Sequence, residues 1–180
     1  MLNREEIINF WFTECDPKIW FKKNLDFDNL IKRKFSRSID ISLKTSFEDV
    51  HVSSDTYLSH IIVLDQFTRN VFRNTYKSFS GDKKALKICK SAIVKGFVNH
   101  INHYYNSFFL MPLMHSENIL DHELGIPLFK KYTNDNTYKF AKKHKEIIYA
   151  FGRFPHRNKI INRKSTDEEI YFLKLPGSRF

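Results

Sequence analysis

Residues 57–73 read YLSHIIVLDQFTRNVFR, and the segment is apolar on every side around residues 61–64. A helix that is apolar all round packs in the centre of a protein, so we expect a central helix here. A buried strand is the alternative that periodicity alone leaves open. Asp65 and Arg69 stand four residues apart, on one side of such a helix, and a buried charge needs a partner. The segment therefore predicts a central helix that carries an Asp65–Arg69 pair.

The composition favours packed helices along the whole chain. The 180 residues are 42% hydrophobic, and 18 phenylalanines stand against only 5 glycines. A β-sandwich needs glycine and proline at many turns, whereas large rings suit the packing of helices. No internal repeat or linker interrupts the sequence. We expect one all-α domain over residues 1–180, built as a bundle of antiparallel helix pairs.

Capping residues and helix breakers set the first boundaries. A helix is expected to begin at Asn3 and to stop at Pro17. A second is expected to begin after Asp26 or Asp28, and the weaker pattern over residues 41–50 predicts a short helix.

Further along, Ser116 is expected to cap a helix that Gly125 and Pro127 kink or divide. Ser116 has no nucleophile-elbow context, so capping explains it better than catalysis. Residues 133–136 predict a turn and the cap of the next helix.

Residues 151–158 read FGRFPHRN, a loop-like basic segment that holds two arginines and a histidine. The helix before it has an apolar face that includes His144, and Gly152 is suited to end that helix in the left-handed conformation. Residues 165–169 (STDEE) offer two overlapping capping boxes for a following helix. His144 is interpreted as a core histidine, with a proton carrier facing the basic segment as the alternative.

The chain begins with acidic residues where a signal peptide would be basic, and its longest apolar runs cannot span a bilayer. We expect a cytoplasmic protein that is not associated with membranes. Cys15 and Cys89 do not fit a C-x-x-C spacing, so we expect reduced thiols, with Cys89 in the core.

The net charge of +10 has two parts. The lysines are scattered along helix faces, as on a solvated surface, and a nucleic-acid partner would require them to gather on one face. The arginines are clustered: Arg69 with Arg73, and Arg153 with Arg157 and Arg163, are five of the nine. Guanidinium binds carboxylate or phosphate through two parallel hydrogen bonds. The use of arginine instead of lysine at these positions therefore indicates a need for such bidentate binding rather than for solubility.

The histidines do not follow the spacing of a metal site. His115 lies near Glu117, and His122 lies beside two acids, but no H-E-x-x-H or comparable ligand set occurs. We predict neither a native metal nor a cofactor.

Three strings together resemble a known family: LDQFTRN at 64–70 with Phe72 and Arg73, MPLMHSE at 111–117, and the basic segment with RKST at 163–166. They are similar to the domain-of-unknown-function 924 family, and the resemblance covers nearly the whole chain. It implies an all-α fold grouped with tetratricopeptide-like helical proteins, and no established activity.

The chain departs from that family pattern at three positions. Thr68 stands where proline is usual, Phe47 where tryptophan is expected, and Asn162 where a glycine usually precedes the arginine. Asparagine tolerates left-handed dihedral angles better than other non-glycine residues do.

The arginines have two competing interpretations. They form a structural clasp that ties loops and helix ends together, or they bind an anion. One or two arginines would suffice to pair Asp65 and Glu117, yet five are present, which favours the anion site.

Two classes of function follow. The first is a pocket for a small phosphate- or carboxylate-bearing ligand, with enzymatic activity left open and His115, Glu117 or His156 as the proton-transferring group. The second is a tetratricopeptide-like module that binds a partner protein or peptide, with the Arg/His motifs structural. A pocket lined by the three strings favours the first class, and an open groove lined by other residues favours the second. The residues expected to bind the ligand are Asp65, Gln66, Arg69, Arg73, His115, Glu117, Arg153, His156, Arg157 and Arg163.

Overall fold

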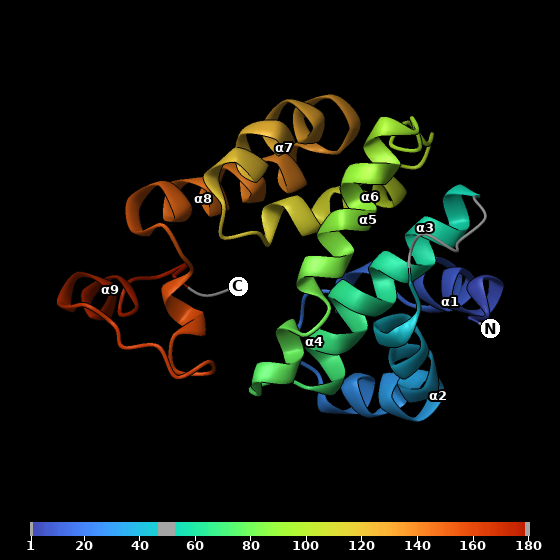
Figure 1. The fold of residues 1–180 in the computed structure, drawn as a ribbon, viewed down its shortest axis with the longest axis horizontal. Helices are drawn as coiled ribbons and strands as arrows, with labels where there is room; N and C mark the ends of the chain where they lie inside the picture. The colour runs from blue at the N-terminus through green and yellow to red at the C-terminus, as the bar shows by residue number, and fades with distance from the viewer. Residues whose placement is uncertain (1, 47–52, 179–180) are drawn as a thin grey trace.

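The computed structural model describes residues 2–46 and 53–178, and every regular element in these ranges is helical (Figure 1). The predicted all-α class is confirmed, while the tetratricopeptide-like arrangement stays a prediction. The elements are α1 (Arg4–Asn9), η1 (Phe10–Glu14), η2 (Pro17–Ile19), α2 (Leu25–Lys44), α3 (Ser54–Ile61), η4 (Ile62–Phe67), α4 (Thr68–Val71), η5 (Tyr76–Phe79), α5 (Asp82–Val94), α6 (His103–Met114), α7 (Ile119–Tyr132), α8 (Asp135–Phe151), η6 (Pro155–Arg157) and α9 (Asp167–Phe172).

The central segment is helical from Ser54 to Val71, and the alternative of a buried strand is wrong. Each residue from 57 to 68 is buried. The segment packs against α1, α2, α5 and α6, so it has neighbours on all sides. Its middle part, η4, is a π-helix, a wider turn that is uncommon and often occurs at functional sites.

Aromatic rings fill the core between the N-terminal helices and α6. The Trp11 ring lies 5.5 Å from the Phe67 ring and 5.5 Å from the Phe108 ring, both edge to face. The Trp20 indole donates to the Trp11 carbonyl at 3.1 Å, so its polar group is satisfied in the core. The high phenylalanine content is therefore used to pack helices together.

Two boundaries in the N-terminal half need correction. Asn3 caps α1 as predicted, but α2 begins earlier than Asp26 or Asp28 because Asn24 accepts the hydrogen bond from the Phe27 N–H. α2 also runs on to Lys44, so Leu43 belongs to its last turn rather than to a separate short helix. Phe47, expected in that short helix, lies outside the described residues.

Helices α6, α7 and α8 follow one another and pack in sequence. The predicted cap at Ser116 is wrong: Asn118 caps α7, and the Ser116 hydroxyl donates to Asp121 at 2.6 Å. α7 also continues past Gly125 and Pro127 instead of being divided there.

The turn around the basic segment agrees with the sequence. Gly152 ends α8 with φ 68°, and Asn162 has φ 56°, the left-handed conformation that asparagine tolerates. Of the two capping boxes offered by residues 165–169, the one between Thr166 and Glu169 starts α9. Figure 1 shows α9 at one edge of the molecule, next to α8.

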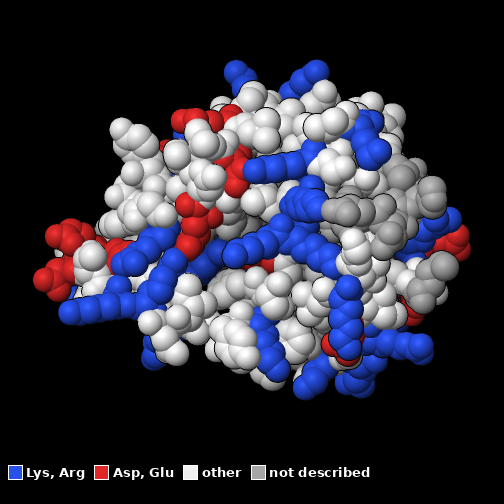
Figure 2. Space-filling model, in the orientation of Figure 1, with Lys and Arg blue, Asp and Glu red and all other residues white. Residues whose placement is uncertain are grey.

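Cys89 is fully buried, as predicted. Within residues 2–46 and 53–178, no helix has the length and apolarity needed to cross a membrane. Figure 2 shows lysines and arginines dispersed over the visible face, with acidic side chains among them.

Candidate functional site

The three strings meet at one cavity of about 540 Å³, although they are far apart in the chain. The central segment, the end of α6 and the basic segment after α8 each contribute to its wall. Residues from the strings that line it are Gln66, Arg69, Asn70, Arg73, Met111, Met114, His115, Phe154, His156 and Arg157.

Asp65 and His115 form a close pair at the base of this cavity. The His115 Nδ1 lies 2.7 Å from Asp65 Oδ1, and Asp65 is fully buried. Gln66 donates to the other carboxylate oxygen, and Arg69 Nη2 lies 3.4 Å from Oδ1. The predicted Asp65–Arg69 pair is present, and His115 is the stronger partner of the carboxylate.

Asp65 and Gln66 lie on the π-helix η4, and Thr68 follows it directly. The Thr68 N–H donates to the Val63 carbonyl, five residues back, which is the wider π-helical spacing. The Thr68 hydroxyl donates to the Leu64 carbonyl at 2.7 Å. The threonine that replaces the usual proline thus supplies two hydrogen bonds that proline could not make.

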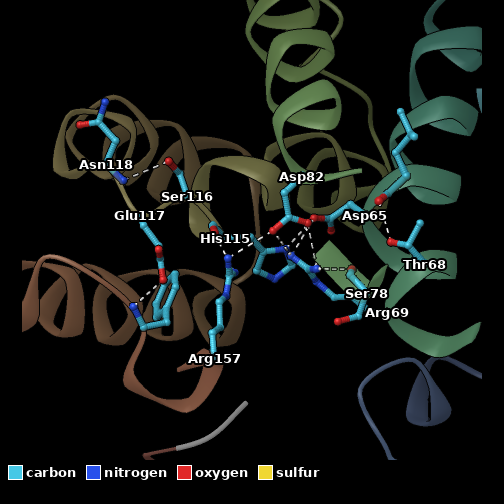
Figure 3. A network of polar contacts seen from close by, with 12 residues as sticks. Asp65, Thr68, Arg69, Ser78, Asp82, His115, Ser116, Glu117, Asn118 and Arg157 are labelled. Atoms are coloured by element: carbon cyan, nitrogen blue, oxygen red, sulfur yellow. Dashed lines mark hydrogen bonds and ion pairs between the residues drawn. The ribbon is translucent and has the colours of Figure 1, made fainter. Parts of the chain in front are cut away.

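Arg157 joins the basic segment to the end of α6 and to the start of α5 (Figure 3). It donates to the carbonyl of His115 at 2.8 Å and to Asp82 at 3.2 Å. Its guanidinium lies 4.7 Å from the ring centre of Phe79 and 4.8 Å from that of Phe154. Arg157 is only 8% exposed, and its Nε has no hydrogen-bond partner among the described residues.

Asp82, the first residue of α5, is the shared partner of two arginines. Arg69 donates to both of its oxygens, at 3.0 Å and 3.2 Å, and also to the Ser78 carbonyl. Arg157 adds the third contact to the same carboxylate. The two guanidiniums are therefore held side by side although they carry the same charge.

The remaining arginines of the motifs also have carboxylate partners. Arg73 binds Asp28 through Nε and Nη2 at 2.7 and 2.8 Å. Arg153 binds Glu169 in the same manner at 2.6 and 2.8 Å. The inference that five arginines exceed the available acids is therefore wrong, because it omitted Asp28, Asp82 and Glu169.

Glu117 ties the basic segment to the end of α6. It accepts hydrogen bonds from Arg163 at 2.6 and 2.8 Å and from the Phe154 N–H at 2.8 Å. Arg163 and Arg153 also donate to backbone carbonyls of the segment, at Phe154 and Lys164. None of Glu117, Arg153 and Arg163, which are among the residues expected to bind the ligand, lines the cavity. Their contacts join the basic segment to the end of α6 and to α9.

The histidines of the cavity are held neutral at physiological pH. Burial lowers the pKa of His144 to about 3 and the pKa of His156 to about 4. Burial also lowers the pKa of His115, and the negative charge of Asp65 opposes this only in part. Burial lowers the pKa of Arg157 to about 10, which leaves its guanidinium charged at neutral pH.

Asp65 stays ionised despite its burial. Burial alone would raise its pKa, but His115 and Arg69 favour the charged form, and the pKa falls below its ordinary value. A buried carboxylate that remains charged beside a neutral imidazole is a typical arrangement for orienting a histidine.

The sequence pattern did not indicate the apolar wall of the cavity. This wall contains side chains from η5, α8 and the connectors, and no sequence motif marks these segments. Asp82, which pairs with the cavity arginines, belongs to a helix whose sequence is that of an ordinary surface helix. His144 is a buried residue of the wall, consistent with the core interpretation, and its Nδ1 lies 2.8 Å from the Phe140 carbonyl.

No group of three metal-ligating side chains that could hold a metal ion occurs in the described ranges. The cavity residues outside the three strings are Trp20, Phe21, Lys22, Asn74, Ser78, Phe79, Asn136, Thr137, Phe140, His144 and Ile160.

Comparison with known proteins agrees with the resemblance of the three strings. No curated protein matches the chain. Among solved structures, the chain is similar to a protein of unknown function, ATU0120 from Agrobacterium tumefaciens, at 30% sequence identity and a TM-score of 0.81. The match covers 95% of this chain and 96% of that one. The family model described as "Bacterial protein of unknown function (DUF924)" matches residues 7–177, and the chain therefore belongs to the DUF924 family.

Proposed function

We propose that the protein binds a small organic anion, with a phosphate or carboxylate group at the arginines and an apolar body against the aromatic wall. One observation carries this proposal. Lys22, Arg69, Arg73 and Arg157 line the cavity, whereas no carboxylate among the described residues does. The acids that pair these arginines, Asp28, Asp65 and Asp82, lie behind them.

The carboxylates reduce the attraction for an anion without removing it. A ligand oxygen about 3 Å from a guanidinium and about 7 Å from the carboxylate behind it gains roughly 3 kcal/mol at an effective dielectric constant of about 20. The pairing also fixes each guanidinium before the ligand arrives, so little side-chain entropy is lost on binding. Paired arginines are therefore compatible with an anion site.

The apolar part of the cavity supports the second half of the proposal. Phe79, Met111, Met114, Phe140 and Ile160 lie in its wall. A cavity of about 540 Å³ falls within the range of about 300–1,000 Å³ that is usual for small-molecule sites. Because the three strings line one cavity of this size, a small molecule is favoured over a partner peptide. The cytoplasmic location expected from the sequence is part of the same proposal.

Thermal denaturation with matched ligands tests this function. Benzoate, phenyl phosphate and octanoate would each be compared with a neutral amide or alcohol of the same size. A ligand that binds the native state raises its stability, so the anions should raise the Tm and the neutral analogues should raise it less. If no anion acts beyond the effect of its neutral analogue, the proposal is wrong.

Two double variants separate the cavity from the overall positive charge. Asp28→Asn with Arg73→Gln removes an ion pair whose arginine lines the cavity. Glu169→Gln with Arg153→Gln removes an equally bidentate pair whose arginine does not. Both leave the net charge unchanged. The anion-induced shift in Tm should decrease in the first variant only, and equal decreases in both would contradict a specific site.

A further inference from the structure

The Asp65–His115 pair leaves one imidazole nitrogen for the cavity. Since an ionised carboxylate only accepts hydrogen bonds, the 2.7 Å contact assigns the proton of the neutral ring to Nδ1. Nε2, across the ring, then carries a lone pair. His115 lines the cavity while Asp65 lies behind it, and Nε2 has no hydrogen-bond partner in residues 2–46 and 53–178.

The neighbouring histidines differ in this respect. His122 Nε2 lies 2.8 Å from the Ser116 carbonyl, and His144 Nδ1 lies 2.8 Å from the Phe140 carbonyl, so carbonyls occupy these nitrogens. His122 does not line the cavity. His115 therefore combines an oriented tautomer, a buried carboxylate partner and a nitrogen available to the cavity.

The charges around His115 come from every element packed against it and are nearly balanced. Its titratable and charged neighbours are Asp65 and Arg69 from the central segment, Asp82 from α5, His122 from α7, His144 from α8, and His156 and Arg157 from η6. Two carboxylates face two guanidiniums, and burial then favours the neutral imidazole. An anion entering the cavity would add a negative charge and favour the imidazolium.

We propose that His115 acts as a general base on the anion bound in the cavity, through Nε2, with Asp65 as its positioning residue. The inference rests on the proposed function, and it narrows the ligand to an organic anion that also carries a hydroxyl group. In this step the hydroxyl proton moves to Nε2 and its electron pair stays on the ligand oxygen. Asp65 stabilises the resulting imidazolium through Nδ1–H, and Arg69 and Arg157 border the space in which the oxyanion forms.

The first test is on the unmodified protein. Nitrogen-15 NMR of labelled histidines distinguishes the two neutral tautomers of each ring. His115 should show the proton on Nδ1 at neutral pH, and its Nε2 signal should titrate. A proton on Nε2 of the neutral ring would overturn the assignment of a base at this atom, whether or not any ligand binds.

The second test measures proton uptake during binding. Inorganic sulfate is the probe, because it carries no proton that titrates near neutrality. Calorimetry in two buffers of different ionisation enthalpy gives the number of protons taken up per sulfate bound near pH 6.5. The wild type should take up a proton fraction on binding sulfate, and this uptake should be lost in His115→Gln.

His103→Gln is the matched control, since His103 is exposed, its Nδ1 lies 3.1 Å from a carbonyl oxygen, and it does not line the cavity. It should retain the uptake. Sulfate binding without proton uptake, or with uptake that persists in His115→Gln, would overturn the inference and leave the proposed function standing. If sulfate and the organic anions all fail to bind, the proposed function is wrong, and the tautomer of His115 then decides whether the base exists.

Discussion

Gly81 lies against the backbone of the π-helix, so close that a Cβ atom built on it would stand 2.1 Å from the carbonyl oxygen of Leu64. This approach brings the start of α5, and with it Asp82, next to Arg69 in the central segment. The position of the shared carboxylate therefore depends on the absence of a side chain one residue earlier.

Gly81→Ala should consequently destabilise the fold and disturb the site together. The Cβ would meet backbone atoms that cannot rotate away, and overpacking of this kind costs about 1–3 kcal/mol or more. Urea denaturation would measure the loss. Gly125→Ala is the control, because its Cβ would meet side-chain atoms of Leu113 at 3.3 Å and of Phe129 at 3.4 Å rather than backbone atoms, and alanine favours a helix. An equal effect of the two substitutions would contradict this account.

Arg157→Met should lower the free energy of unfolding by an amount on the order of 2–5 kcal/mol, as the loss of a buried charged partner does. The substitution leaves the His115 carbonyl and one contact of Asp82 without their donor. Arg157 lies in the segment after α8 and Arg69 in the central helix, yet Arg157 is the more buried of the two, with a side-chain exposure of 10% against 21%.

Chemical denaturation checks this prediction, and Arg33→Met is its control. Arg33 is exposed on α2, so its replacement should change stability by no more than about 0.5 kcal/mol. A variant of Arg157 as stable as the wild type would mean that the guanidinium is held for a ligand rather than for the fold.

The protein should lose stability as the pH falls from about 6.5, above the range in which carboxylates titrate. Burial lowers the pKa of His144 to about 3, and the pKa values of His60 and His156 to about 4. At pH values between these pKa values and the pKa of a histidine in the unfolded chain, each of these histidines is protonated in the unfolded state but not in the folded state. Each such histidine then removes about 1.4 kcal/mol of stability per pH unit.

The depressed carboxylates add to this loss at lower pH. Arg153 lowers the pKa of Glu169 to about 2, so the stability from that pair is present at neutral pH and disappears as the pH falls below about 4.5 toward 2. Urea unfolding at several pH values between 7.5 and 5 would show the histidine part alone. His144→Gln should flatten the slope and His103→Gln should not; a stability independent of pH in this range would contradict the prediction.

Local features of the fold could be predicted because a few neighbouring residues determine them. Gly152 ends a helix in the left-handed conformation, Asn3 caps a helix, and the apolar run at 61–64 lies in the centre. The wrong boundaries have local causes too. Asn24 competes successfully with Asp26 as a cap, and Pro127 lies in an α-helix that tertiary packing maintains.

The ion pairs could be predicted only in part, because most join residues that are distant in the chain. Asp65 and Arg69 are four residues apart, so the sequence predicts their pairing, whereas Asp28 and Arg73 are separated by 45 positions. Asp82 resembles an ordinary acidic residue in the first turn of a helix. Its role arises only when α5 is packed against the central segment.

The variant Glu117→Gln tests whether Glu117 serves as a structural clasp of the basic segment or binds the ligand in the cavity. Glu117 was a candidate for proton transfer, but its two oxygens are occupied by Arg163 and the Phe154 N–H, and these hydrogen bonds lower its pKa despite burial. An amide would place an N–H group against a guanidinium, which should cost an amount on the order of 1–3 kcal/mol.

The exchange of backbone amides in residues 153–166 of the Glu117→Gln variant should accelerate, while the anion-induced shift in Tm should persist. Glu123→Gln, at an exposed position of α7, should change neither. Loss of the anion response with unchanged amide protection would instead assign Glu117 to the ligand.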